Sequence, residues 1–536
     1  MSDPVNLLET ARRWLDAEPD ADMRNELESL LSDPEEALAA RFAGRLQFGT
    51  AGLRAPVGAG PLRMNRLVVR QAAAGLVDYL LDAVPDAARL GVLIGCDARR
   101  KSDVFALDTA RVCAARGVRA LLFDSVVPTP LLAWSITQVN GGRGAAAGVM
   151  VTASHNPPAD NGYKVYLGTG AQIVPPADAD ISARIEGVDP CAVALAPDDH
   201  PLIQRVGADE RRAYLAAVGA VRLRPDAAGV PVAYTAMHGV GGQLLVDAFA
   251  AAGLPAPIVV ESQQHPDGLF PTVAFPNPEE PGAMDLLLQQ AAASGAALAL
   301  ANDPDADRLG AAIPQADGTW RRLHGDEIGW LMADHILRHT SGGERLVVTT
   351  LVSSSLLSRL AASHGVRCIE TFTGFKWIGH VVLANPGLRF VFGYEQALGY
   401  LVAARPLDKD GITAAVLLAE IAAVAAAEGT TLQERLDSLA HQFGRHITSE
   451  RSLRMDPAAG RDAVASLRAA PPASVGGIAV TSVEWFDEAG LLRLQLGESL
   501  RLQVRPSGTE PKVKLYGEGV DRDPGPLLDD LSALLG

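Results

Sequence analysis

Apolar runs alternate with longer amphipathic segments along most of this chain. Strand-like runs occupy residues 89–99, 118–124 and 144–154. Between the first two, residues 102–117 have a helix-like pattern that ends at Gly117. Short apolar runs bounded by turn residues predict buried strands, and longer periodic segments predict helices. Their alternation predicts a parallel sheet with crossover helices.

The same order of elements restarts twice, near residue 211 and again near residue 325, without close sequence identity between the cycles. From about residue 441 the pattern changes to short strands typical of an antiparallel sheet. We therefore expect an α/β fold with three related α/β domains, built on mainly parallel mixed sheets, and a C-terminal α+β domain. The expected boundaries are 1–210 with an N-terminal helical extension, 211–324, 325–440 and 441–536.

Composition and charge narrow the class of protein. The chain has 536 residues, of which 48% are hydrophobic and 21% are charged, so disordered and fibrous classes are excluded. The formal net charge is −16, and lysine and arginine form no long cluster. We therefore expect no nucleic-acid partner, although a local basic pocket could still bind a small anion.

Three further features predict a cytoplasmic protein that does not enter a membrane. The first 18 residues form an acidic amphipathic pattern, unlike a signal peptide. The long apolar run at 411–429 is rich in alanine and interrupted by Glu420, which predicts a core helix. The four cysteines lie too far apart for a metal or redox motif and are expected to be reduced, buried thiols. They are Cys96, Cys113, Cys191 and Cys368.

The first candidate for chemistry is Ser154, in the stretch "VTASHNPPADNGYKVY". It follows a strand, and open parallel sheets bind ligands beyond the carboxyl ends of their strands. Pro157 and Pro158 restrict the backbone, and we expect a stiff polar turn that ends at Lys164. A hydroxyl held in this way suits a nucleophile or a phosphoryl carrier, and no G-x-S-x-G motif of a hydrolase surrounds it. A Ser-His-Asn turn with only local hydrogen bonds is the alternative.

The second candidate is "ANDPDADRLG", in which Asp303, Asp305 and Asp307 alternate after a predicted strand. This spacing can bring three carboxylates together in a loop, where they repel one another unless a cation compensates them. Ligation by carboxylates alone suits a hard divalent ion, Mg²⁺ before Zn²⁺. The guanidinium of Arg308 beside such an ion suits a phosphate. A solvated acidic turn is the alternative.

Other loops offer cations, hydroxyls or carboxylates to a polar ligand. The stretch "RPSGTEPKVKLY" can wrap a phosphate with charge-assisted hydrogen bonds. The stretch "QFGTAGLRAPVG" supplies a cation, and "TFTGFKWIG" and "FGYEQALGY" lie at predicted strand ends. For each of them an ordinary turn or surface loop is the alternative. The candidate residues are Arg54, Gly374, Lys376, Glu395, Arg505, Ser507, Gly508 and Thr509.

Together these loops resemble the α-D-phosphohexomutase superfamily, which contains phosphoglucomutases, phosphomannomutases, phosphoglucosamine mutases and related phosphopentomutases. The stretch "TASHNPPADNGYK" resembles the phosphoserine loop, "DPDADR" the metal loop, "GYEQALGY" the sugar loop and "RPSGTEPK" the phosphate loop. One motif falls in each of four successive regions, so the resemblance covers essentially the whole chain. It implies four domains around a central cleft.

The resemblance also implies a mechanism. Ser154 would carry a phosphoryl group, pass it to a sugar monophosphate and take back the other phosphate of the resulting bisphosphate. Mg²⁺ would bind a phosphoserine oxygen and the three aspartates. Lys164 would be the general acid/base, a role that needs a lowered pKa. His155 would orient the phosphoserine, and Glu395 would contact sugar hydroxyls.

The sugar loop departs from the form common in this superfamily. Many members have Glu-x-Ser-Gly, often followed by His, whereas Glu395 is followed here by Gln-Ala-Leu-Gly-Tyr. This form, and the lysine at 376 after Thr-Gly-Phe, are similar to the phosphoglucomutase/phosphopentomutase branch. We therefore expect exchange of glucose 1-phosphate and glucose 6-phosphate by a monomer or homodimer, with a sugar bisphosphate as activator. Mannose and pentose phosphates stay open as substrates. A Mg²⁺-dependent sugar phosphatase and a non-catalytic sugar-phosphate-binding protein are the competing classes.

Overall fold

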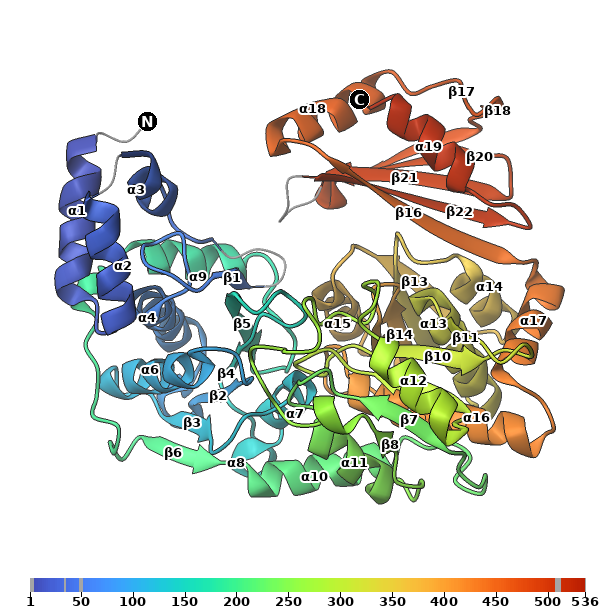
Figure 1. Ribbon diagram of the computed structural model, residues 1–536, viewed down its shortest axis with the longest axis horizontal. Coiled ribbons are helices and arrows are strands. Elements are labelled where there is room, and N and C mark those ends of the chain that lie inside the picture. The colour runs from blue at the N-terminus through green and yellow to red at the C-terminus, as the bar shows by residue number, and fades with distance from the viewer. Residues whose placement is uncertain (1–3, 33–34, 48–51, 507–511, 536) are drawn as a thin grey trace. The chain divides into compact units, whose positions relative to one another are not determined.

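The computed structural model describes residues 4–32, 35–47, 52–506 and 512–535 (Figure 1). The chain divides into two compact units. The first unit comprises residues 1–323 and 399–420, and the second comprises residues 324–398 and 421–536. Each unit is built around sheets covered by helices, as the alternating pattern predicts.

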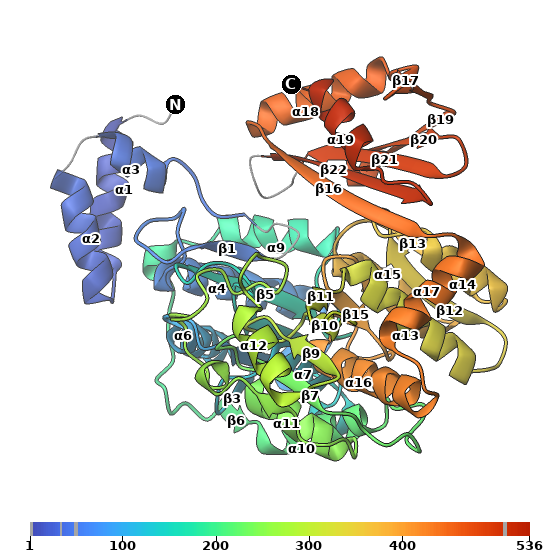
Figure 2. The same ribbon diagram turned by 45° about the vertical axis from the view of Figure 1, so that its right-hand side comes forward.

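The N-terminal extension is helical, and its three helices lie side by side in both views (Figures 1 and 2). Trp14 and Phe42 meet edge to face with ring centroids 5.8 Å apart. Both belong to the same apolar cluster as Leu53 and Leu67, so the extension shares the core of the first sheet. The helices are α1 (Pro4–Ala17), α2 (Ala21–Ser32) and α3 (Glu35–Phe42).

The first sheet has the strand order β1-β5-β4-β2-β3-β6. Its central strand β2 is parallel to β3 and β4, as the sequence predicts, while β5 is antiparallel to its neighbours β1 and β4. The strands are β1 (Leu53–Pro56), β2 (Val92–Cys96), β3 (Ala120–Phe123), β4 (Ala147–Val151), β5 (Asp160–Leu167) and β6 (Ile203–Val206). The helices are α4 (Arg66–Ala83), α5 (Ala87–Leu90), α6 (Ser102–Ala115), α7 (Thr129–Ile136), α8 (Val139–Gly142) and α9 (Ala177–Glu186).

The prediction of a polar turn as far as Lys164 is wrong in its second half. The turn ends at Asp160, where β5 begins, and Met150 of β4 lies opposite Lys164 in an antiparallel pair. Tyr163 and Val165 are buried apolar neighbours, which make this segment a strand despite its lysine. The pairing brings Lys164 back beside the strand that leads to Ser154.

The second sheet of this unit has the order β11-β10-β9-β7-β8. Parallel strands β7 and β9 form its centre, and β10 pairs antiparallel with β9, so residues 302–309 form a tight connection between two buried strands. The strands are β7 (Val232–Thr235), β8 (Ile258–Val259), β9 (Leu298–Ala301), β10 (Gly310–Pro314) and β11 (Trp320–Arg322). The helices are α10 (Ala208–Gly219), α11 (Gly242–Ala251) and α12 (Asp285–Ser294).

In the second unit, β12 is parallel to both β13 and β14, which confirms the third α/β cycle. The strands are β12 (Arg345–Thr350), β13 (Arg367–Thr371) and β14 (Arg389–Glu395). The helices are α13 (Gly325–His339), α14 (Leu356–Ser363), α15 (Phe375–Ala384) and α17 (Leu432–Phe443). A short strand, β15 (Gly399–Leu401), follows β14 in the chain.

The C-terminal sheet is antiparallel throughout, with the order β16-β22-β21-β20-β19. Both α18 and α19 lie on one face of it, where they share an apolar cluster with β20, β21 and β22 (Figures 1 and 2). This is the predicted α+β domain. Its elements are β16 (His446–Arg454), α18 (Pro457–Ala469), β17 (Ser474–Val475), β18 (Ile478–Ala479), β19 (Ser482–Phe486), β20 (Leu491–Leu496), β21 (Leu500–Pro506), β22 (Lys512–Val520) and α19 (Gly525–Ala533).

The apolar run at 411–429 forms the buried helix α16 (Gly411–Ala427), as predicted. Glu420 is fully buried in it and pairs with Arg222 at 2.9 Å. Within the described part of the chain, no single helix has the length and apolar composition needed to cross a membrane. Helices α16 and α17 meet such a test only as a pair bent by 88°.

The cysteine prediction is half right. All four thiols are free, but only Cys96 and Cys113 are buried, while Cys191 and Cys368 are half-buried. Burial raises the pKa of both Cys96 and Cys113 to about 12, so these two thiols are protonated and unreactive at neutral pH.

Candidate active site

Ser154 lies three residues beyond the end of β4, in the loop of residues 152–160 that we call the Ser154 loop. Its backbone has a φ of 52°, and the residue is 3% exposed. The hydroxyl donates to Asp303 Oδ2 at 2.8 Å and lies 3.2 Å from Nδ1 of His155. The hydroxyl is therefore held in one place, and its partner at Asp303 comes from a different sheet.

The three aspartates of the β9–β10 connection converge. One carboxylate oxygen from each lies within 4.8 Å of the others, and all three residues are fully buried. A turn makes this possible, because the N–H of Ala306 donates to the carbonyl of Asp303 at 2.9 Å. Thr129 fixes Asp305 by donating to its Oδ2 at 2.6 Å. The expected convergence is confirmed, and the alternative of a solvated acidic turn is excluded.

Two lysines face this acidic cluster. Lys164 Nζ lies 2.7 Å from Asp305 Oδ2 and 2.9 Å from Asp307 Oδ2. Lys409 Nζ lies 3.3 Å from the same oxygen of Asp307. Two ammonium groups therefore stand against three carboxylates, and the charges of Arg54 and Arg308 also act on this cluster.

The pKa values of the aspartates reflect burial and these opposing charges. Burial, together with the charges of Asp305 and Asp307, raises the pKa of Asp303 well above its ordinary value. Burial acts in the same direction on Asp307, but Lys164 and Lys409 outweigh it and hold that pKa low. Oδ1 of Asp305 and Oδ1 of Asp307 are buried without a hydrogen-bond partner among the described residues. Converging, unsatisfied carboxylate oxygens fit a hard divalent cation.

Lys164 does not show the lowered pKa that an acid/base role requires. Burial alone would lower it, but the carboxylates of Asp305 and Asp307 outweigh burial and raise the pKa above its ordinary value. In this arrangement Lys164 is a charged partner of the acidic cluster, and its acid/base role stays a prediction.

The remaining candidates of the first unit surround the same loops. Burial, followed by the charges of Arg308 and Arg54, lowers the pKa of His155 well below its ordinary value, so its imidazole is neutral. Arg54 Nη1 donates to the side-chain oxygen of Asn156 at 3.1 Å. The backbone N–H of Arg308 donates to Asp303 Oδ1 at 3.0 Å. The structure therefore brings all the predicted residues of this unit together.

The second unit carries the candidate sugar and phosphate contacts. Glu395 is the last residue of β14, and Lys376 lies in the first turn of α15. Gly374 precedes that helix with a φ of 109°, a conformation that favours glycine. Arg505, near the end of β21, donates to the hydroxyl of Tyr516 at 3.4 Å. The other predicted residues of that loop, Ser507, Gly508 and Thr509, lie outside the described residues.

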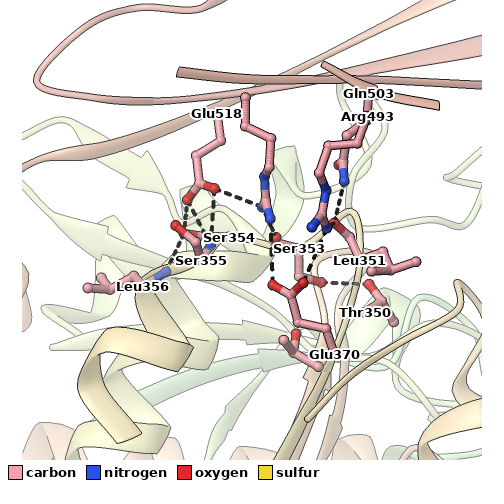
Figure 3. A network of polar contacts seen from close by, with 12 residues as sticks. Thr350, Leu351, Ser353, Ser354, Ser355, Leu356, Glu370, Arg493, Gln503 and Glu518 are labelled. Atoms are coloured by element: carbon pink, nitrogen blue, oxygen red, sulfur yellow. Dashed lines mark hydrogen bonds and ion pairs between the residues drawn. The ribbon is translucent and has the colours of Figure 1, made fainter. Parts of the chain in front are cut away.

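Polar contacts anchor the strand that carries Arg505. Arg501, Gln503 and Arg505 alternate along β21 and therefore lie on one face. Arg501 donates to the carbonyl of Ser353 at 2.6 Å, and Gln503 donates to the carbonyl of Leu351 at 2.7 Å. Figure 3 labels Gln503 together with Leu351 and Ser353, which lie in the loop between β12 and α14. Arg505 thus lies on a strand that is hydrogen-bonded to the loop between β12 and α14.

Lys409 was missed by sequence analysis although it is part of the acidic cluster. It lies in "LDKDG", before the apolar helix α16, with neither a strand end nor a glycine-rich loop to mark it. Its neighbour Asp408 accepts hydrogen bonds from Tyr166 and Gln172, each at 2.8 Å. A lysine between two aspartates just before a buried helix was the available signal.

Models of one protein family match most of the chain. They are described as phosphoglucomutase/phosphomannomutase alpha/beta/alpha domain I, domain II, domain III and C-terminal domain. They match residues 45–190, 212–317, 324–443 and 454–525, respectively. The α1–α3 extension precedes the first match.

Curated relatives and a solved structure agree with these matches. A probable phosphomannomutase of Haemophilus influenzae is 42% identical over 86% of this chain and 94% of its own. A probable phosphoribomutase of Schizosaccharomyces pombe is 35% identical over 96% of this chain and 94% of its own. The crystal structure of a putative phosphomannomutase from Thermus thermophilus covers 92% of this chain and 99% of its own, with 24% identity and a TM-score of 0.70. The chain therefore belongs to the phosphoglucomutase/phosphomannomutase family and is an enzyme of its intramolecular phosphotransferase type.

Proposed function

We propose that this enzyme interconverts hexose 1-phosphate and hexose 6-phosphate through a phosphoserine at Ser154 and a bisphosphorylated sugar intermediate. One observation carries the proposal: the Ser154 hydroxyl bonds to Asp303 at the edge of a buried cluster of three aspartates. Phosphoryl transfer depends on alignment and on neutralised charge, and this cluster beside a fixed hydroxyl is suited to both.

Asp303, Asp305 and Asp307 are the residues that would hold Mg²⁺. The buried, unpartnered oxygens of Asp305 and Asp307 support this assignment, because hard cations prefer carboxylate oxygens. When bound, the ion supplies positive charge at the transferring phosphoryl group. The guanidinium groups of Arg54 and Arg308 add fixed positive charge from the protein itself.

The chemical step exchanges one O–P bond for another. The bond from Ser154 Oγ to phosphorus breaks as a sugar hydroxyl forms its own bond to phosphorus, and that hydroxyl loses its proton. Lys164 is the proposed acceptor of the proton. This role requires Lys164 to separate from Asp305 and Asp307, whose charges raise its pKa in the arrangement described here. Neutral His155, 3.2 Å from the hydroxyl, is the proposed orienting partner.

Residues of the second unit are the remaining proposed substrate contacts. Arg505, with Ser507, Gly508 and Thr509, would bind the phosphate that does not react. Glu395, Gly374 and Lys376 would contact the sugar. Because the bisphosphate must react from either end, the phosphate site should recognise phosphate itself in both orientations.

Glucose is the preferred sugar on this proposal, and mannose is a possible second substrate. Pentose phosphate is the alternative, favoured by the named activity of the fission yeast relative, which matches nearly the whole chain. The alanine at 397, where many superfamily members have serine, leaves fewer side-chain hydrogen bonds for a hexose. A preference for the smaller sugar would agree with that difference.

Two measurements test the proposal. Values of kcat/KM for the 1-phosphates of glucose, mannose, glucosamine and ribose, with catalytic sugar bisphosphate and Mg²⁺, identify the sugar. Peptide mass analysis of the resting enzyme should find one phosphoryl group on Ser154. Steady release of inorganic phosphate without product isomer would replace the proposal with a phosphatase. Binding of sugar phosphate without either activity would replace it with a non-catalytic binding protein.

A further inference from the structure

The backbone carbonyls of the Ser154 loop converge on one buried side chain, that of Arg99. Nη2 of Arg99 donates to the carbonyl of Ser154 at 2.6 Å and to that of Asn156 at 2.5 Å. Nη1 donates to the carbonyls of Pro157 at 2.8 Å and Asp160 at 3.1 Å. Two terminal nitrogens therefore hold four carbonyl oxygens of the loop.

Arg99 is itself fixed from the first sheet. Asp97 directly follows β2, and its Oδ1 accepts both the backbone N–H of Arg99 at 3.0 Å and the hydroxyl of Ser102 at 2.7 Å. Oδ2 of Asp97 lies 3.3 Å from Nε of Arg99. The guanidinium therefore starts from a rigid element, and each of its three nitrogens already faces a protein oxygen.

A segment between β8 and α12 covers the same side chain. The ring centroid of Phe270 lies 4.9 Å from Cζ of Arg99. The backbone of Gly268 comes so close that a Cβ added there would lie 2.4 Å from the carbonyl oxygen of Ala98. Arg99 is only 3% exposed, so neither solvent nor a soluble ligand reaches most of its surface.

The Ser154 loop has a conformation that requires such support. Ser154 has a φ of 52°, a left-handed conformation that is uncommon for a residue with a side chain. Its carbonyl is one of the four held by Arg99, and its hydroxyl must stay in reach of Asp303. A shift of the backbone by 1 Å would move the hydroxyl out of alignment.

We propose that Arg99 is a positioning residue for phosphoryl transfer: it fixes the backbone of the Ser154 loop so that Oγ of Ser154 points at the aspartate cluster. This role rests on the proposed function, because it takes Ser154 as the phosphoryl carrier. The planar guanidinium fork is essential to it, since the compact ammonium of lysine cannot serve four carbonyls spread along a loop. Arg99 offers no nitrogen to substrate, so substrate affinity should not depend on it.

The test compares wild type with Arg99→Met and Arg99→Lys. The rate of Ser154 phosphorylation by sugar bisphosphate is followed by intact mass, together with steady-state kcat and KM. We expect Arg99→Met to lower both the phosphorylation rate and kcat about 100-fold, the effect of a 1 Å misplacement, with KM unchanged. The phosphorylation rate and kcat of Arg99→Lys should lie between those of wild type and those of Arg99→Met. Added guanidinium at low, non-denaturing concentration should accelerate Arg99→Met, whereas methylammonium should not.

Arg345 provides a matched control. It is also a buried arginine, 8% exposed, and it donates to the backbone carbonyls of Leu337, Thr340 and His364 in the second unit. Arg345→Met should lower the unfolding temperature but leave kcat per folded molecule unchanged, and guanidinium should not alter its rate.

The outcomes separate the two proposals. If Arg99→Met folds and phosphorylates Ser154 at the wild-type rate, the positioning role is wrong. If Arg99→Met does not fold, Arg99→Lys decides, and a wild-type rate in that variant overturns the role as well. Wild-type enzyme that turns over without ever carrying phosphate on Ser154 would overturn the proposed function, and this role with it.

Discussion

Ser154 Oγ donates a hydrogen bond to Asp303 Oδ2 across 2.8 Å, although 149 residues separate the two in the sequence. Ser154 follows β4 of the first sheet, and Asp303 follows β9 of the second. Each therefore lies beyond the carboxyl end of a parallel strand, where open α/β sheets place their ligands. The contact joins two predicted loops into one site.

Replacing Ser154 by alanine should abolish mutase turnover while the fold is retained. The alanine removes the only atom proposed to carry phosphorus. It also removes the hydrogen-bond contacts of that hydroxyl with Asp303 and His155, and a hydrogen bond contributes about 1 kcal/mol net. A coupled assay of sugar 6-phosphate formation and a thermal unfolding curve measure the two effects. Ser135→Ala is the control, since Ser135 is fully buried in α7 and its hydroxyl has no partner among the described residues. Turnover by Ser154→Ala within tenfold of wild type would remove the serine from the mechanism.

Asp305→Asn should weaken Mg²⁺ binding. Loss of one carboxylate removes a ligand oxygen with its charge, and Lys164 keeps only Asp307 as an acidic partner. Bound ligand stabilises a folded protein by mass action, by about 2.7 kcal/mol at 100 times Kd. The unfolding temperature of wild type, stripped with chelator, should therefore rise with Mg²⁺, and that of Asp305→Asn should rise much less at the same concentration.

Asp317→Asn is the control for the metal experiment. Asp317 lies in an exposed turn before β11, where it accepts from Thr319 at 2.6 Å. Like Asp305→Asn, Asp317→Asn removes one carboxylate charge, but it leaves the cluster of three aspartates intact. An equal Mg²⁺ response in Asp305→Asn and Asp317→Asn would contradict the assignment of the three aspartates.

Much of the fold could be predicted because it depends on local patterns. The buried run at 92–96 and the helix after it show their periodicity directly, and Gly117 marks the end of that helix. The alternation of Asp303, Asp305 and Asp307 after a strand was equally visible. In each case the deciding signal lies within about ten consecutive residues.

The features that escaped prediction depend on distant partners. Segment 160–167 becomes a strand because β1 and β4 flank it, and its lysine is neutralised by aspartates about 140 residues away. In sequence, Arg99 and Lys409 resemble ordinary surface cations. Only the folded chain shows that both are buried among oxygen atoms, so their roles had no local signal.

Glu518→Gln should destabilise the second unit. Glu518 is buried in β22, accepts from Ser354 and Ser355 and pairs with Arg501 at 2.7 Å (Figure 3). Removal of its charge breaks the ion pair with Arg501, and breaking a buried pair costs about 3 kcal/mol. Chemical unfolding at pH 7 measures the change. Glu450→Gln, which breaks a more exposed pair with Lys514 in the same sheet, should cost less than about 1 kcal/mol.

The effect of Glu518→Gln should depend on pH. Burial acts to raise the pKa of Glu518, but His446, Arg501 and Ser354 outweigh it and lower the pKa from 4.5 to about 2. A lowered pKa stabilises the folded state above pH 4.5, and the stabilisation is lost as pH falls towards 2. The difference in unfolding free energy between wild type and variant should therefore shrink across that interval. A constant difference would show that the carboxylate is not held ionised by its partners.

Glu18 should give the opposite pH dependence in the N-terminal extension. The residue is 3% exposed, and burial raises its pKa from 4.5 to about 7, with the charge of Asp20 adding to the rise and Arg70 and Lys101 opposing it. A raised carboxyl pKa stabilises the folded state below pH 4.5, and this stabilisation is lost as pH rises through 7, at a cost of up to about 3 kcal/mol. Glu18→Gln cannot ionise, and its amide oxygen can still accept from the N–H of Asp20. We therefore expect the variant to unfold at a higher temperature than wild type at pH 8 and at a similar temperature at pH 4.5.

Glu9→Gln, on the exposed side of α1, controls for the loss of one acidic charge from the same extension. If the unfolding temperatures of wild type and Glu18→Gln differ by the same amount at pH 4.5 and at pH 8, Glu18 does not become charged inside the fold.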